Sequence, residues 1–389
     1  MVTFTDLDAI TITQLQATGA TRWTGAPHEI GAFTAEMDFG IDQAITDVLA
    51  REIRVGNFAY LPPSYAQALQ HATAEMLRNR YQVEVPEGWI HEVPDVLRAM
   101  EMVIGHYTPP GTAVVVPTPA YMPFVTWPER FGRQVIQVPM LVSESGEYSY
   151  DLEGIDRAFA SGARLLLHCD PHNPSGRSFT RQELVALSEV VERHDARVFS
   201  DEIWAPLTFS GHRHIPYFSV TQAAARHTIT ALSASKGWNL PGLKCAQLLV
   251  HNEADEQTWV QVGHPARHGT ANLGVVANAA AYSRGFTWLD GILAYLERNA
   301  RDIAAFVDQR LPRARMPRPQ GTYVAWLDLS EYALGDHPAA WLRRETGVWL
   351  TEGTDCGAVG AGHVRMIHAM PHPILLEALE RIATGLGEG

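Results

Sequence analysis

The feature that most constrains the fold is an alternation of two patterns between about residues 110 and 250. Short runs rich in β-branched residues alternate with segments whose apolar residues recur at helical spacing. This alternation is typical of parallel strands joined by crossover helices. We expect strands at 112–117, 133–140, 163–169, 196–201, 228–234 and 246–252. The sequence therefore predicts an α/β protein with a mostly parallel sheet.

Other segments predict the rest of the architecture. Thr180 and Glu183 form a capping-box signature at the start of a helix, and 64–81 and 274–311 have helical periodicity, the latter as one long region that can be kinked. A strand within 321–330 and a closing helix at 373–386 indicate a smaller α+β domain. We predict an N-terminal segment (1–45) that packs with the small domain, a large domain (46–285) and the small domain itself (286–389).

Composition excludes several classes of protein. The chain has 389 residues, 46% of them hydrophobic, which is enough to form a sizeable core. Its formal net charge of −13 argues against a nucleic-acid partner, because such partners need clustered positive charge. The three cysteines show no CxxC spacing and suit a reducing compartment. No leader-like or membrane-spanning run is evident, so we expect a cytoplasmic protein without a membrane partner.

Chemically distinct side chains follow the expected strands. Asn173 follows the third strand, Asp201 ends the fourth, and Lys236 follows the fifth. Each alone reads more simply as a turn residue, a cap or a surface charge. Ligands of parallel α/β sheets gather at the carboxyl ends of the strands, however, so the ordered set predicts a site there.

Longer motifs carry a family resemblance. "PTPAY", "PHNPSGR", "SDEIW", "SASKGWNLPGLK" and "GHVRM" resemble the fold-type I, class I/II aminotransferase superfamily, which uses pyridoxal phosphate. "AEMDF", "GNFAY", "GFTWLDGILAYLERN" and "TYVAWLDL" more narrowly resemble the cystathionine β-lyase type of C–S lyase. The resemblance runs from about residue 30 to the C-terminus. It implies a seven-stranded-type, mostly parallel sheet flanked by helices in the large domain, together with the smaller α+β domain.

The resemblance assigns roles around the cofactor ring. Lys236 matches the lysine that bonds to the cofactor aldehyde and then acts as a base. Asp201 matches the carboxylate that keeps the pyridine nitrogen protonated. Asn173 matches the donor to the ring hydroxyl, and Tyr121 matches the aromatic that stacks on the ring.

A second set matches the phosphate site. Ser233 and Lys244 occupy phosphate-binding positions, with Ser235 as a weaker candidate, and Lys244 stands where many relatives have arginine. The helix starting near Asp95 and Val96 is expected to offer backbone N–H groups to the phosphate. The Asp95 carboxylate itself would repel phosphate, so we expect it to turn away as a helix cap.

Three more residues complete the comparison. Arg365 matches the arginine that binds the substrate α-carboxylate, with Asn173 beside it. Tyr60 matches a tyrosine that reaches the partner subunit's phosphate, which implies a homodimer. Trp204 is a departure, because relatives usually have tyrosine or histidine there and an indole cannot accept a hydrogen bond or titrate. No metal-like spacing appears, and we assign no metal.

The expected activity is β-elimination from a cysteine S-conjugate such as cystathionine, giving a thiol, pyruvate and ammonia. Three alternatives stay open at this point. An aminotransferase would use the same residues, and a biosynthetic variant would decarboxylate or oxidise the conjugate. A non-catalytic, partner-binding protein that keeps the fold is the third, although folding alone does not demand Asn173, Asp201, Lys236 and Arg365 together.

Overall fold

The computed structural model describes residues 3–388. Its central element is a seven-stranded sheet in the order β2-β10-β9-β8-β7-β3-β4. The strands are β2 (Ile90–Val93), β3 (Val114–Thr118), β4 (Val135–Pro139), β7 (Leu165–Cys169), β8 (Arg197–Asp201), β9 (Thr228–Leu232) and β10 (Ala246–Leu249). Only β10 runs antiparallel to its neighbours, β2 and β9, so the mostly parallel sheet is confirmed. The short β2 lies upstream of the alternating region and was not predicted.

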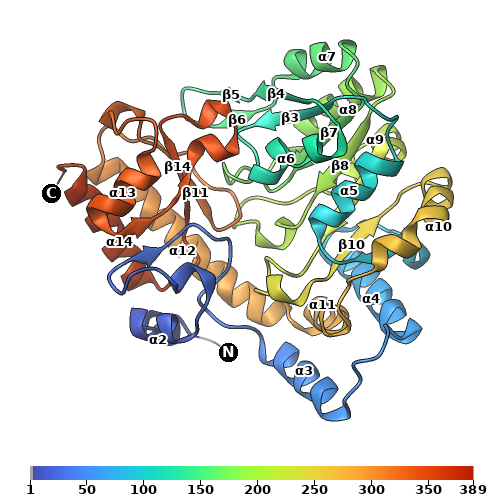
Figure 1. Cartoon of the computed structure of the whole chain (residues 1–389), viewed down its shortest axis with the longest axis horizontal. Helices are drawn as coiled ribbons and strands as arrows, with labels where there is room; N and C mark the ends of the chain where they lie inside the picture. The colour runs from blue at the N-terminus through green and yellow to red at the C-terminus, as the bar shows by residue number, and fades with distance from the viewer. Residues whose placement is uncertain (1–2, 389) are drawn as a thin grey trace.

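Helices lie around the sheet, some of them in direct contact with it and others packed on neighbouring helices (Figure 1). They are α3 (Gln43–Val55), α4 (Pro63–Met76), α5 (Val96–His106), α6 (Met122–Thr126), α7 (Leu152–Ala160), α8 (Arg181–Arg193), α9 (Gln222–His227), α10 (Glu253–Arg267), α11 (Asn272–Arg284) and α12 (Phe286–Arg310). The predicted capping box at α8 is confirmed: the Thr180 backbone N–H donates to Glu183, and the Glu183 N–H donates to the Thr180 hydroxyl. Local sequence therefore sets where this helix begins.

The expected helical region at 274–311 is divided at Gly285. The indole N–H of Trp238 donates to the Gly285 carbonyl at 2.9 Å. A Cβ at Gly285 would lie only 2.4 Å from that indole nitrogen, so the position has no room for a side chain. The break therefore places a tryptophan two residues from Lys236 against the joint between α11 and α12.

The C-terminal part forms a second, smaller layer. A three-stranded sheet of β11 (Val324–Asp328), β14 (His363–Ile367) and β13 (Thr351–Glu352) packs with α13 (Pro338–Thr346) and α14 (His372–Gly385). The short strand β1 (Ile30–Gly31) pairs with β12 (Val348–Trp349). In Figure 1 the N-terminal helix α2 (Ile12–Ala17) also lies on this side of the molecule. The predicted boundaries at 45 and 285 stay predictions.

Helix α12 joins the two hydrophobic cores. Its first half, including Leu289 and Leu296, belongs to the core that contains the face of the central sheet. Its second half, including Ile303 and Val307, belongs to the core of the C-terminal part. One continuous helix thus runs between the layer that carries Lys236 and the layer that carries Arg365. No helix among residues 3–388 is long and apolar enough to cross a membrane.

Candidate active site

One pocket of about 180 Å³ lies at the carboxyl ends of the strands. Strands β7, β8 and β9 are adjacent there, with Cys169, Asp201 and Ala231 in register. The pocket lining includes ten of the residues selected from the sequence: Asp95, Val96, Tyr121, Asn173, Asp201, Trp204, Ser233, Ser235, Lys236 and Lys244. The fold therefore brings together residues spread over about 150 positions of the chain.

Lys236 lies on the turn after β9. Its Nζ donates to the backbone carbonyl of Ala35 at 2.7 Å, and the Tyr323 hydroxyl donates to the same carbonyl at 3.0 Å. Burial lowers the pKa of Lys236 to about 8, helped by nearby Arg365 and opposed by Asp201. The amine is therefore easier to deprotonate than an exposed lysine.

Asp201 ends β8 and is buried. Its Oδ1 accepts the backbone N–H of Ile203 at 3.1 Å. Burial raises the pKa of Asp201 to about 7, although the Ile203 N–H and the charge of Lys236 oppose the shift. An ionised carboxylate in this position is costly unless a positive group faces it.

Behind Asp201 lies a buried ion cluster that the sequence reasoning missed. The Nε2 of His214 lies 3.0 Å from Glu202, and its Nδ1 lies 3.2 Å from Asp170 as an ion pair outside hydrogen-bond alignment. Burial alone would lower the pKa of His214, but the two carboxylates raise it to about 9. The cluster joins the loops that follow β7 and β8. No local sequence pattern marks His214, because its partners lie 12 and 44 positions upstream.

Arg365 on β14 reaches the site from the C-terminal layer. Its Nη1 donates to Asn173 Oδ1 at 3.3 Å, and its Nη2 donates to the Phe33 carbonyl at 2.8 Å. Arg365 is buried, and its Nε has no hydrogen-bond partner among residues 3–388. A buried guanidinium with unused N–H capacity is suited to an anionic ligand.

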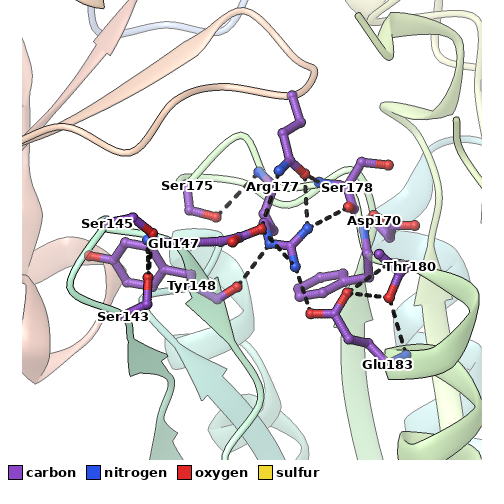
Figure 2. Close-up of polar contacts among 12 residues, drawn as sticks. Ser143, Ser145, Glu147, Tyr148, Asp170, Ser175, Arg177, Ser178, Thr180 and Glu183 are labelled. Carbon is purple, nitrogen blue, oxygen red and sulfur yellow. Dashed lines mark hydrogen bonds and ion pairs between the residues drawn. The ribbon is translucent and has the colours of Figure 1, made fainter. Parts of the chain in front are cut away.

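Arg177 lies four residues after Asn173, at the end of the same turn, and Figure 2 shows the polar contacts around its side chain. The Arg177 side chain donates to the Tyr148 carbonyl at 3.0 Å and to Glu183 at 2.6 Å. It also donates to the side chain of Gln320 at 2.9 Å. Arg177 is mostly buried, so its role is to tie these segments together rather than to bind solvent ions.

Two aromatic side chains flank the pocket. Tyr121 lies directly before α6, and burial raises its pKa to about 12, so it is neutral at physiological pH. Trp204 is buried, and its ring packs edge-on against Tyr323 with centroids 4.7 Å apart. The Lys236 Nζ lies 5.6 Å from the Trp204 ring centroid, a distance at which a cation is attracted to the ring face.

The opposite end of the pocket combines a helix N-terminus with hydroxyls. Asp95 caps α5, since its Oδ1 accepts the Arg98 N–H at 2.8 Å, and the predicted cap is confirmed. The Ser233 hydroxyl donates to the Cys245 carbonyl at 2.7 Å and accepts from the Ser235 N–H, so its proton is already engaged. The weaker candidate, Ser235, lines the same wall.

One contact here was not expected. The Lys244 Nζ lies 3.1 Å from the second carboxylate oxygen of Asp95. The Asp95 carboxylate therefore turns only partly away from the pocket. It forms an ion pair with Lys244, the lysine that the family resemblance matched to the phosphate site.

Tyr60 lies outside this pocket. It follows α3 and is 94% exposed. Within residues 3–388, no group of three or more His, Cys, Asp or Glu side chains is placed to hold a metal ion. The residues that sequence reasoning missed in the lining include Ala35, Cys169 and Cys245. Ala35 stands in the quoted motif "AEMDF", but its contribution is a backbone carbonyl, which residue identity does not reveal.

Comparison with known proteins identifies relatives along almost the whole chain. Residues 34–382 match the family described as aminotransferase class I and II. The chain is 36% identical to a cystathionine beta-lyase of Corynebacterium glutamicum, covering 94% of this chain and 96% of that protein. It is 32% identical to cystathionine beta-lyase PatB of Bacillus subtilis, covering 93% and 94%.

A solved structure agrees with the fold. A protein of Corynebacterium diphtheriae described as a putative PLP-dependent beta-cystathionase superposes with a TM-score of 0.91 at 32% identity, covering 97% of this chain and 98% of that one. The match of 349 consecutive residues and these full-length similarities lead to one conclusion. The chain belongs to the class I and II aminotransferase family.

Proposed function

We propose that the chain is a pyridoxal-phosphate-dependent β-lyase that cleaves a cysteine S-conjugate, such as cystathionine, to a thiol, pyruvate and ammonia. The observation that carries the proposal is the convergence of Lys236, Asp201 and Asn173 in one pocket, with Arg365 hydrogen-bonded to Asn173 beside it. The lyase names of the relatives above favour elimination over transamination on the same scaffold. A cytoplasmic location stays a prediction.

The pocket fits this cofactor at both ends. The buried carboxyl of Asp201 lacks a strong cationic partner, and a protonated pyridine nitrogen would supply one. At the other end, the Val96 N–H in the first turn of α5 and the Lys244 amine suit a phosphate. Between them, Tyr121 would cover the ring and Asn173 would donate to its hydroxyl. Ser233 and Ser235 would contribute to the phosphate wall, and Trp204 would pack beside the ring.

The chain's own groups then divide the work. When bound, pyridoxal phosphate supplies an electron sink for the carbanion at the substrate Cα. Lys236 would hold the aldehyde and afterwards accept the Cα proton, which its lowered pKa of about 8 suits near neutral pH. Arg365 would bind the α-carboxylate and so aim the Cα–H bond at that amine. The β-thiolate leaves as the thiol, and one water molecule is consumed as the rest of the substrate is released as pyruvate and ammonia.

A substrate panel tests this function. Holoenzyme incubated with cystathionine and other cysteine S-conjugates is expected to release thiol and pyruvate in equal amounts without any 2-oxo acid. A strict requirement for a 2-oxo acid would instead identify an aminotransferase. Released carbon dioxide or consumed oxygen would identify a decarboxylating or oxidative variant, and no product from any conjugate would contradict the proposal.

The Asp95–Lys244 contact predicts that Asp95 weakens phosphate binding. Asp95→Asn keeps a good helix cap but removes a negative charge beside the phosphate. We expect the dissociation constant of pyridoxal phosphate to fall about fivefold, since one such contact near the surface contributes about 1 kcal/mol. The change should shrink as salt rises. Titration of the apoprotein by absorbance checks it.

Asp151→Asn is the matched control, because Asp151 caps α7 in the same way and does not line the pocket. It should leave cofactor affinity unchanged. An unchanged or weaker affinity in Asp95→Asn would show that Asp95 does not compete with the phosphate.

We also propose that the active unit is a homodimer in which Tyr60 reaches the partner's phosphate. In its support, Tyr60 belongs to an exposed apolar group with Ile53, Val55 and Phe58, which are 58–70% exposed. Tyr60→Ala and Lys236→Ala chains should each be inactive or weak alone. Mixed and refolded together, they should regain activity, since one site of each hybrid dimer then has both residues. Monomeric sedimentation or no recovery would contradict the homodimer.

A further inference from the structure

A backbone strap crosses behind the turn that carries Asn173. The strap is residues 319–323, the segment that leads into β11. The Gln320 N–H donates to the Gly176 carbonyl at 2.8 Å, while the Gln320 carbonyl accepts the Phe209 N–H at 2.9 Å. Gly176 has a positive φ of 70°, and a Cβ there would lie 3.1–3.3 Å from the strap. Turn and strap therefore fit closely enough that only glycine suits this position.

The side chain of Gln320 reinforces this contact. Its Oε1 accepts from Arg177 Nη1 at 2.9 Å and from the Ser178 N–H at 3.0 Å. One amide oxygen thus holds a backbone and a side-chain donor of the turn at the same time. Arg177 and Gln320 are called the latch below.

The Arg177 guanidinium is fully occupied. Besides Gln320, it contacts the carbonyls of Tyr148 and Ser178 and the carboxylates of Glu183 and Glu147. In Figure 2 these groups surround the guanidinium from three segments: the hairpin of β5 (Leu141–Val142) and β6 (Tyr148–Ser149), the turn, and the start of α8. Because all N–H groups of this buried guanidinium already have acceptors, Arg177 holds the segments that supply those acceptors in fixed positions relative to one another.

Both ends of the latched unit lead into the site. At one end is Asn173, which lies four residues before Arg177 in the chain. Its side-chain oxygen accepts a hydrogen bond from Arg365. At the other end, the strap continues to Tyr323, whose hydroxyl donates to the Ala35 carbonyl that also holds Lys236. The latch therefore sets the spacing between the amide beside Arg365 and the tyrosine beside Lys236, although neither Arg177 nor Gln320 lines the pocket.

We propose that Arg177 and Gln320 are positioning residues that hold Asn173 against Arg365 and thereby shape the binding site for the substrate α-carboxylate. This inference rests on the proposed function, in which Arg365 binds that carboxylate. Loosening the latch lets the turn move, so Arg365 loses the Asn173 contact to Nη1 and is held only through Nη2, by the Phe33 carbonyl and Thr351. Substrate binding weakens, while Lys236 and Asp201 keep their own contacts.

The test uses Gln320→Met, which keeps the length of the side chain but removes the acceptor. In the holoenzyme we expect KM for a cleaved conjugate to rise about tenfold with kcat changed less than about twofold, the pattern of lost ground-state binding. The affinity for L-alanine, followed by the visible absorption of the cofactor, should fall by about the same factor. The affinity for ethylamine, which has the amine but no carboxylate, should stay unchanged.

Glu147→Gln is the matched control, because Glu147 contacts the Arg177 guanidinium and the Gln320 side-chain amide from the surface, and glutamine keeps an acceptor oxygen for both donors. It should leave both ligands unaffected. If Gln320 has a purely structural role, Gln320→Met lowers the affinities for L-alanine and ethylamine equally or changes neither affinity. Either result would overturn the proposal. If no conjugate is cleaved but the two ligands still separate, the lyase function fails and the positioning role stands.

Discussion

Replacing Lys236 with alanine is expected to reduce the rate of thiol release roughly ten-thousandfold or more, because in the proposed function Lys236 is both the amine that holds the cofactor and the base for the Cα proton. The Lys236 amine is held by the Ala35 carbonyl. The other lysine of the pocket lining, Lys244, lies at the opposite end of the pocket and cannot replace it. Steady-state thiol release with added cofactor measures the effect. The visible absorption of the purified protein should also lose the band of covalently held cofactor.

Lys244→Ala provides the contrast. It should keep kcat within about threefold at saturating cofactor while the cofactor dissociation constant rises roughly tenfold, since in the proposed function Lys244 contributes charge to phosphate binding and not to the reaction. Comparable loss of kcat in both variants would contradict the division of roles between the two lysines.

Asp201→Asn has the second largest expected effect. The amide keeps the shape and the acceptor for the Ile203 N–H, but it cannot balance a positive charge on the pyridine nitrogen. We expect kcat to fall roughly a thousandfold, or about 4 kcal/mol of transition-state stabilisation. Rapid-quench measurement of thiol release in a single turnover separates this loss from slow product release.

One result with Asp201→Asn would contradict the proposed role of Asp201 in keeping the pyridine nitrogen protonated. If Asp201→Asn retains more than about a tenth of wild-type kcat, the carboxylate does not maintain the charge of the ring. Asp151→Asn again serves as a control, because it makes the same chemical change at a helix cap outside the pocket.

The sequence predicted the sheet and the convergence of Asn173, Asp201 and Lys236 for a physical reason. Strand periodicity is local, and parallel strands bring their carboxyl ends to one edge wherever the chain places them. The Thr180 capping box was predictable for the same reason, since its partners lie within one helical turn. The order of these residues along the chain was therefore enough to predict that they lie at one edge of the sheet.

Other features depend on contacts that no local pattern encodes. The Ala35 carbonyl meets Lys236 across 201 positions, and Lys244 meets Asp95 across 149. Backbone groups carry no side-chain signature, and loop side chains find partners only after the chain has packed. The cluster around His214 was missed because its carboxylate partners, Glu202 and Asp170, lie 12 and 44 positions upstream.

The break at Gly285 has a mechanical consequence. Trp238 joins the lysine turn to the point where the 25-residue α12 begins, and α12 extends into the core that supports Arg365. Because the acceptor of the Trp238 hydrogen bond is the Gly285 carbonyl, the indole fixes the point where α12 begins. The indole thus anchors the helix that spans both hydrophobic cores to the turn that carries Lys236, so the positions of the two layers are coupled through one hydrogen bond.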